Sequence, residues 1–77
     1  MPLDSLPEWA LAQQRVIGER IRAARRQAGM SQVQLGEAVG RDHKTVHRWE
    51  TALTAPTLMD LILIAHAVNV PLAELVR

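Results

Sequence analysis

The stretch SQVQLGEAVGRDHKTVHRWE, residues 31–50, decides the fold that this 77-residue sequence predicts. It contains two short helical segments, Gln32–Val39 and His43–Glu50, with a glycine in the turn between them. Each segment follows a residue whose side-chain oxygen can cap a helix, Ser31 for the first and Asp42 for the second. Two helices joined by a turn of this length containing glycine are typical of a helix-turn-helix.

Cap signals outside this stretch predict three more helices. Ser5-Leu6-Pro7-Glu8 has the form of a capping box, and Gly29 follows the long apolar-periodic segment that it begins. Thr57 and Pro71 begin two further segments, with Asn69 expected in left-handed backbone between them. The five helices are expected at about 6–28, 32–39, 43–50, 58–68 and 71–76. The sequence therefore predicts an all-α fold, a compact five-helix bundle that contains a helix-turn-helix and has an extended first helix.

Apolar residues at helical spacing indicate which faces should be buried. In the first helix the inner stripe is predicted to hold Trp9, Ala10, Ile17, Ile21, Ala24 and Ala28. In the fourth it is predicted to hold Leu58, Leu61, Ile62, Ala65 and Val68, with Ile64 nearby. Gly36 lies inside a helix, where glycine costs about 1 kcal/mol relative to alanine. We therefore expect the following helix to approach Gly36 closely.

Composition narrows the class of protein. A chain this short holds one core, so residues 1–77 are expected to form a single domain, with Met1–Asp4 as a short lead. Cysteine is absent, which excludes disulfides and zinc sites built on thiolates. No apolar run approaches the ~18 residues of a membrane helix, and residues 1–15 lack a signal-peptide pattern. These features predict a cytoplasmic protein without membrane contact.

The charged residues are unevenly distributed although the net charge is only +1. Eight of the nine Lys and Arg lie within positions 15–48 beside three acidic residues, a local charge of +5. Residues 49–76 contain no Lys or Arg and three acidic residues. A basic half joined to an acidic, apolar half favours a polyanionic partner on one side.

Several groups of residues carry a resemblance to a known family. They are Ser31–Gly40, Val46–Glu50, the segment Leu58–Ala65 after Pro56, and the ending Val-Pro-Leu-Ala-Glu-Leu at 70–75. These groups resemble, in register, the Cro and phage-repressor type of helix-turn-helix, also called xenobiotic-response-element-like. The resemblance implies a small five-helix DNA-binding regulator.

The resemblance runs from about Ile17 to Val76, and residues 1–16 form an extension outside it. The sequence departs from the family pattern at two positions. Gly36 replaces the usual alanine, and Ala52 stands where the family usually has glycine after the third helix.

The helix His43–Glu50 carries polar side chains around its inward residues Val46 and Trp49. The second helix of a helix-turn-helix lies in the major groove, with its N-terminal residues near the base edges. Lys44 and Arg48 are one turn apart, and either can donate two hydrogen bonds to guanine. The candidate base-reading residues are His43, Lys44, Thr45, His47 and Arg48. The resemblance assigns that role to His43, Lys44 and Arg48 in particular.

Phosphate contacts are expected where helix 32–39 begins, because free backbone N–H groups and the helix dipole favour an anion there. Ser31 and Gln32 occupy this end, and the resemblance assigns Gln32 to the DNA backbone. The hydroxyls of Thr51 and Thr54 are further candidates. The resemblance also implies a structural ion pair between Arg25 and Glu50. Arg22 and Arg26 are interpreted as surface charge, with phosphate as an alternative partner.

No combination of residues indicates an enzyme, a metal or a cofactor. His43 and His47 have the i, i+4 spacing of metal ligands on a helix, but the general base of a metalloprotease is missing between them. No third ligand is evident, and Lys44 would repel a cation. A glycine-rich phosphate loop and a cysteine nucleophile are also missing.

Apolar residues that the core does not require are candidates for a partner surface. Met59, Leu63, His66, Leu72 and Val76, with Val70, are predicted to form an apolar patch at the acidic end of the chain. Trp9, with Leu6 and Leu11, is a second candidate surface outside the family resemblance. The first surface suggests a homodimer and the second a protein partner of the N-terminal segment.

The sequence therefore predicts a transcriptional regulator that binds double-stranded DNA as a homodimer on an inverted repeat. Related small regulators include autoregulators, restriction–modification controllers and antitoxins. The alternative is an antitoxin-like or other protein-interaction module with secondary DNA binding. A third interpretation is a helix-turn-helix domain that has lost DNA binding.

Overall fold

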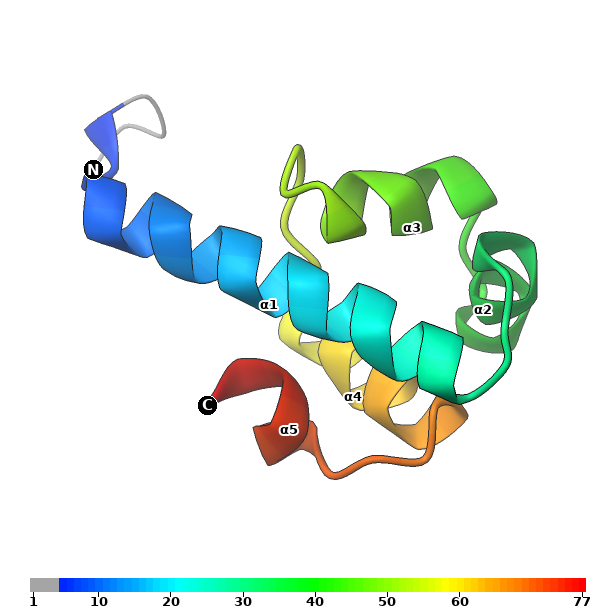
Figure 1. Cartoon of the computed structure of the whole chain (residues 1–77). Coiled ribbons are helices and arrows are strands. Elements are labelled where there is room, and N and C mark those ends of the chain that lie inside the picture. The colour runs from blue at the N-terminus through cyan, green and yellow to red at the C-terminus, as the bar shows by residue number, and fades with distance from the viewer. Residues whose placement is uncertain (1–4) are drawn as a thin grey trace.

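The computed structural model describes residues 5–77, which form five helices and no strand (Figure 1). The helices are α1 (Glu8–Gln27), α2 (Gln32–Val39), α3 (His43–Glu50), α4 (Leu58–Ala67) and α5 (Leu72–Val76). The predicted all-α, five-helix architecture with a long first helix is confirmed. The short lead predicted over Met1–Asp4 lies outside the described residues.

Side-chain caps begin α2, α3 and α4, as the sequence predicts. Ser31 and Gln34 form a reciprocal capping box, in which the Ser31 hydroxyl accepts the Gln34 N–H at 3.0 Å. Asp42 accepts the Lys44 N–H at 2.7 Å. Left-handed backbone follows four of the helices, at Gly29 (φ 71°), Gly40 (φ 74°), Ala52 (φ 60°) and Asn69 (φ 59°). These caps satisfy helix-end groups that no intrahelical partner can reach.

The capping box predicted at Ser5–Glu8 is wrong. Pro7 occupies the N-cap of α1 in extended backbone (ψ 148°), and no side chain caps this end. Glu8 therefore becomes the first helical residue. Its carboxylate pairs with Arg15, whose Nη2 lies 2.6 Å from Glu8 Oε1, two turns along the same helix.

Every helix contributes one fully buried side chain to the core. These five residues are Ile21, Leu35, Val46, Ile64 and Leu75. Trp49, Val39, Ala65 and Val68 complete the buried cluster. Because α3 contributes Val46 and Trp49 three residues apart, one face of α3 is buried and the opposite face is left to solvent.

Two glycines allow backbone segments to approach within the distance that a Cβ would occupy. A Cβ on Gly36 would lie 2.5 Å from the Arg41 carbonyl oxygen in the turn before α3 and 3.4 Å from the backbone nitrogen of His43, where α3 begins. A Cβ on Gly18 would lie 2.6 Å from the Trp49 carbonyl oxygen. Gly36 thus leaves room for the turn between α2 and α3, and Gly18 lets the backbone of α1 contact the end of α3.

The predicted inner stripe of α1 is wrong at its two ends. Trp9 is 75% exposed, because the first turns of α1 project beyond the other helices (Figure 1). Ala28 is also exposed, since it lies past the last helical residue. The buried part of the stripe begins at Ile17 and continues through Ile21 and Ala24.

The predicted inner stripe of α4 is confirmed at Leu61, Ala65 and Val68 and wrong at Leu58 and Ile62. Leu58 is 67% exposed and Ile62 is 42% exposed, whereas Asp60 and Ile64 are buried. Asp60 can be buried because its carboxylate accepts the Thr57 N–H at 2.9 Å and pairs with Arg41 at 3.0 Å. Apolar periodicity alone did not indicate that a charged residue would occupy the inner face.

None of the helices in residues 5–77 combines the length and the apolarity that crossing a bilayer requires.

Candidate nucleic-acid interface

The outward face of α3 presents four exposed polar residues. His43, Lys44, His47 and Arg48 are exposed and Thr45 is half-buried, while Val46 and Trp49 anchor the helix from below. The structure thus brings all five candidate base-reading residues onto one short helix. The buried side chains of Val46 and Trp49 fix the position of α3 and hence of its exposed residues.

Most arginines of the described chain are already engaged. Arg15, Arg25, Arg41 and Arg77 form ion pairs with carboxylates, and Arg20 donates to the carbonyl oxygen of Arg77. Within residues 5–77, the side chains of Lys44 and Arg48 on α3, and of Arg22 and Arg26 on α1, make no ion pair or hydrogen bond. These four cations keep their full charge for an external anion.

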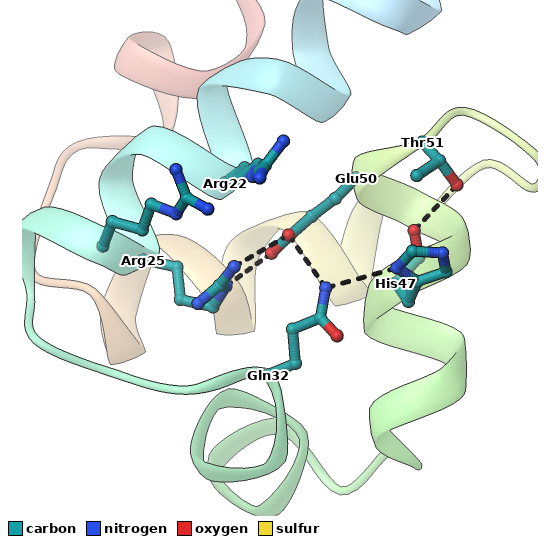
Figure 2. Close-up of a pocket in the computed structure, with 7 residues that line it drawn as sticks. Arg22, Arg25, Gln32, His47, Glu50 and Thr51 are labelled. Carbon is teal, nitrogen blue, oxygen red and sulfur yellow. Dashed lines mark hydrogen bonds and ion pairs between the residues drawn. The ribbon is translucent and has the colours of Figure 1, made fainter.

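Arg25 and Glu50 form a bidentate ion pair between α1 and the end of α3 (Figure 2). Arg25 Nε lies 2.6 Å from Glu50 Oε2, and Arg25 Nη2 lies 3.0 Å from Oε1. The side chains are 10% and 2% exposed. Hydrogen bonding to Glu50 raises the pKa of Arg25 against the opposing effect of burial. The third donor of the guanidinium bonds to the Met30 carbonyl at 2.8 Å, so the pair ties α3 to the end of α1.

Gln32 connects this ion pair to the exposed face of α3. Its Nε2 lies 3.2 Å from Glu50 Oε1 and 3.4 Å from His47 Nδ1 (Figure 2). A carboxylate only accepts hydrogen bonds, so the Gln32 atom facing it must be the NH2 group. In this arrangement His47 Nδ1 is placed to accept the second amide proton, which fits the tautomer that carries its proton on Nε2.

Asp42 adds a negative charge where α3 begins. The pKa of its carboxyl is lowered, chiefly by the hydrogen bond from the Lys44 backbone and further by the nearby His43, Lys44 and Arg48. His43 Nδ1 lies 3.5 Å from Asp42 Oδ1. Asp42 therefore stabilises the positive N-terminus of α3 and holds His43 beside it.

The candidate phosphate residues border the same face but are partly engaged. The Ser31 hydroxyl caps α2, and both amide protons of Gln32 point to protein acceptors. The Thr51 hydroxyl donates to the His47 carbonyl at 2.9 Å, and Thr54 is exposed in the loop that follows. The first backbone N–H groups of α2 have no acceptor within the helix and remain suited to an anion.

The candidate partner surface on α4 is larger than the sequence predicts. Met59 is 61% and Leu63 40% exposed, and His66 is exposed, as expected. Leu58 and Ile62 extend this outward face of α4. Leu72, by contrast, packs against the core, and Val76 is 37% exposed. The exposed Trp9 lies apart, near the start of α1 (Figure 1).

Sequence reasoning missed three features that position this site. Gly18 was not singled out, although a glycine inside a long helix is itself a signal of close approach. The Arg41–Asp60 pair and the Gln32–His47 contact each join residues that lie far apart in the sequence. No spacing rule along a single helix connects them.

A buried α3 anchor, a preceding capped helix and free cations on the exposed face define a helix-turn-helix protein. Residues 16–77 match the model of the helix-turn-helix domain family, and the chain belongs to that family. Such membership implies a small DNA-binding regulator without an enzymatic role.

A solved structure supports the same conclusion. The chain is similar to the restriction-modification controller protein C.AhdI from Aeromonas hydrophila, with 28% identity and a TM-score of 0.79. The match covers 83% of this chain and 97% of C.AhdI. No curated protein sequence matches the chain significantly. The resemblance to Cro-type and phage-repressor-type regulators is thereby confirmed, and residues 1–15 lie outside the family match.

Proposed function

We propose that the protein is a sequence-specific transcriptional regulator that inserts α3 into the major groove of DNA. The observation that carries this proposal is the pair of unengaged cations on α3. Lys44 and Arg48 are exposed, one turn apart, on a helix whose other face is anchored by Val46 and Trp49. A cation with no protein partner is free to donate to guanine O6 and N7.

The other candidate residues take complementary roles in this proposal. His47 donates its Nε2–H to an acceptor on a base edge, since Gln32 occupies Nδ1. His43 and Thr45 contact neighbouring bases. Ser31, Gln32, Thr51 and Thr54 approach the phosphates on either side of the groove, Gln32 through its backbone N–H while its side chain holds His47.

We further propose that the protein binds an inverted repeat as a homodimer, in keeping with one domain over residues 1–77. A single reading helix covers few base pairs, and two copies place their helices about 34 Å apart on one side of the duplex. The outward face of α4, formed by Leu58, Met59, Ile62 and Leu63, supplies a contiguous apolar surface for this contact. Polar His66 borders it.

The first experiment is an in vitro selection from a random duplex pool, followed by binding of the enriched duplex and a scrambled one at two salt concentrations. We expect two inverted half-sites containing guanine, and binding that weakens steeply with salt. Lys44→Ala and Arg48→Ala should relax the preference at individual positions, by about 1–3 kcal/mol each. Arg15→Ala, which removes a cation paired with Glu8, is the matched control.

Leu63→Glu tests the dimer separately. We expect it to reduce the mass in solution from that of a dimer to that of a monomer and to weaken binding to the full inverted repeat. Wild-type protein that is monomeric on the full site at micromolar concentration would refute the dimer. Selection that enriches no sequence would refute specific recognition.

A protein-interaction module is the second candidate, and the exposed Trp9 favours it. Trp9 was predicted to be buried but is 75% exposed. It lies in the first turn of α1, outside the residues that match the family. Deletion of residues 1–14 distinguishes the two functions. Loss of a protein contact with intact DNA binding would support the interaction module.

A further inference from the structure

A cavity of about 310 Å³ lies between α1 and α3, beside the proposed reading helix. Its walls include Arg22 from α1, Gln32 from α2, and His47 and Thr51 from the end of α3 (Figure 2). Arg26, one turn beyond Arg22 on α1, also lines it. The Arg25–Glu50 ion pair also lines it. Arg22 and Arg26 are exposed on α1.

The charge in this cavity is positive and uncompensated. Glu50 is the one acidic residue lining it, and Arg25 and Gln32 already engage both of its carboxylate oxygens. Arg22 and Arg26 have no carboxylate partner within the described chain. They are spaced i, i+4 on one face of α1, so their like charges repel unless an anion lies between them.

Some hydrogen-bond donors of the cavity already bond to protein acceptors, and others do not. Both amide protons of Gln32 are directed to Glu50 and His47, and the Thr51 hydroxyl donates to the His47 carbonyl. Beside the Nε2 atom of His47, the two unpaired guanidinium groups of Arg22 and Arg26 are therefore the donors left for a ligand of the cavity. A planar guanidinium can donate two hydrogen bonds to a single phosphate group.

We propose that Arg22 and Arg26 bind one phosphodiester of the DNA duplex at this cavity. His47 and Thr51 line the cavity. His47 also lies on α3, the helix proposed to enter the groove, and Thr51 caps the C-terminal end of α3. A duplex read by α3 therefore brings its backbone against α1. This proposal rests on the proposed function, because the phosphate is that of the duplex α3 reads. It makes the second half of α1 part of the interface.

The test compares two double variants that remove equal charge. Arg22→Ala with Arg26→Ala removes the proposed phosphate ligands, whereas Arg15→Ala with Arg77→Ala removes two exposed arginines paired with Glu8 and Glu74. We expect the first variant to lose on the order of tenfold in affinity for the selected duplex beyond the loss of the control. The slope of log K against log salt should fall by about 0.9 for each bound protomer, the value for one phosphate of B-DNA.

Neutralised DNA locates the contact. Each phosphate of the selected duplex is replaced in turn by an uncharged methylphosphonate. At one position in each half-site, the wild-type protein should lose affinity while the Arg22→Ala, Arg26→Ala protein loses none, because the interaction is already absent. Thermal unfolding of both double variants should match the wild type, since all four arginines are exposed.

Three outcomes overturn the proposal, and they differ in meaning. If both double variants lose the same affinity and slope, the phosphate site is wrong while DNA binding stands. If inorganic phosphate shifts the Arg22 and Arg26 side-chain NMR signals more than chloride at equal ionic strength, and duplex binding is unchanged in the variant, the site belongs to a small anion. If the wild-type protein binds no duplex, the proposed function fails as well.

Discussion

Two buried carboxylates hold the helix-turn-helix in place, and they obtain their hydrogen bonds in different ways. Glu50 at the end of α3 is bonded by the side chains of Arg25 and Gln32. Asp60 in α4 accepts the Thr57 backbone N–H and pairs with Arg41, whose side chain is 47% exposed. The carboxylate of Glu50 therefore depends on distant side chains, and that of Asp60 partly on its own helix end.

This difference predicts which properties change when either carboxylate loses its hydrogen-bond partners. The bonds of Glu50 join α1, α2 and α3, and through Gln32 they reach His47 on the exposed face. The bonds of Asp60 join α4 to the turn before α3 and end there. Loss at Glu50 should thus affect both stability and DNA recognition, whereas loss at Asp60 should affect stability alone.

The largest expected effect is that of Arg25→Ala. It leaves Glu50 buried with an uncompensated charge, which typically costs about 3–5 kcal/mol. Denaturant unfolding should show this loss, and DNA affinity at a temperature where the variant is folded should fall as well. Arg25→Met combined with Glu50→Leu is the control, because an apolar pair of similar volume should recover most of the stability. A smaller loss of stability than that of Arg41→Ala would contradict the proposed difference between Glu50 and Asp60.

Arg41→Ala should cost less, about 1 kcal/mol, because Arg41 is half exposed and Asp60 keeps its bond to the Thr57 N–H. Its affinity for the selected duplex should equal that of the wild type when both are fully folded. Paired unfolding and binding measurements on the two variants check this contrast. Reduced binding by folded Arg41→Ala protein would show that the Asp60 side also reaches the interface.

The pH dependence of stability tests the contribution of the Asp60 carboxylate. Burial raises the pKa of Asp60, but hydrogen bonds from Thr57 and Arg41 outweigh it, so the net pKa lies below the ordinary value of about 3.9. Asp60 therefore stabilises the fold above that value, and this contribution is lost as pH falls through its folded pKa. Asp60→Asn should be less stable than the wild type at neutral pH, and the gap should close in acid. Asp42, whose pKa is also lowered, is present in both proteins and cancels in the difference.

Local signals made most of the fold predictable. Ser31, Asp42 and Thr57 fix helix starts through their own side chains, so their roles follow from a few neighbouring residues. The errors arose where distant contacts decide. Asp60 takes the inner face of α4 because Arg41 and Thr57 satisfy it, and no periodicity rule contains that pair. The candidate reading residues follow from the place of the second helix in a helix-turn-helix and from the family resemblance, but the contact that orients His47 comes from Gln32 on α2.

Ala52→Gly tests the loop that follows Glu50. Ala52 adopts φ 60°, and a non-glycine residue in left-handed backbone is strained by about 1–2 kcal/mol. Glycine relieves this strain but adds freedom to the unfolded chain, so the net gain should be about 0.5–1 kcal/mol. The same substitution at Ala55 is the control, since Ala55 has no positive φ. Equal effects at both positions would remove the argument from strain.

Gln32→Ala should have the smallest effect on stability and the most specific effect on the interface. Glu50 keeps both bonds to Arg25 and loses only the one from Gln32, and a hydrogen bond at this half-exposed site is worth about 0.5–1 kcal/mol. His47, however, loses the donor that holds Nδ1 unprotonated. The ring ¹⁵N chemical shifts of His47 should show mainly the Nε2–H form in the wild type and a mixture of forms in the variant. Gln34→Ala, which removes the reciprocal cap at the same helix end, should leave the His47 spectrum unchanged, because Gln34 contacts Ser31 and not α3. A His47 spectrum that ignores Gln32 would mean that the bonds of Glu50 stop short of the exposed face, as those of Asp60 do.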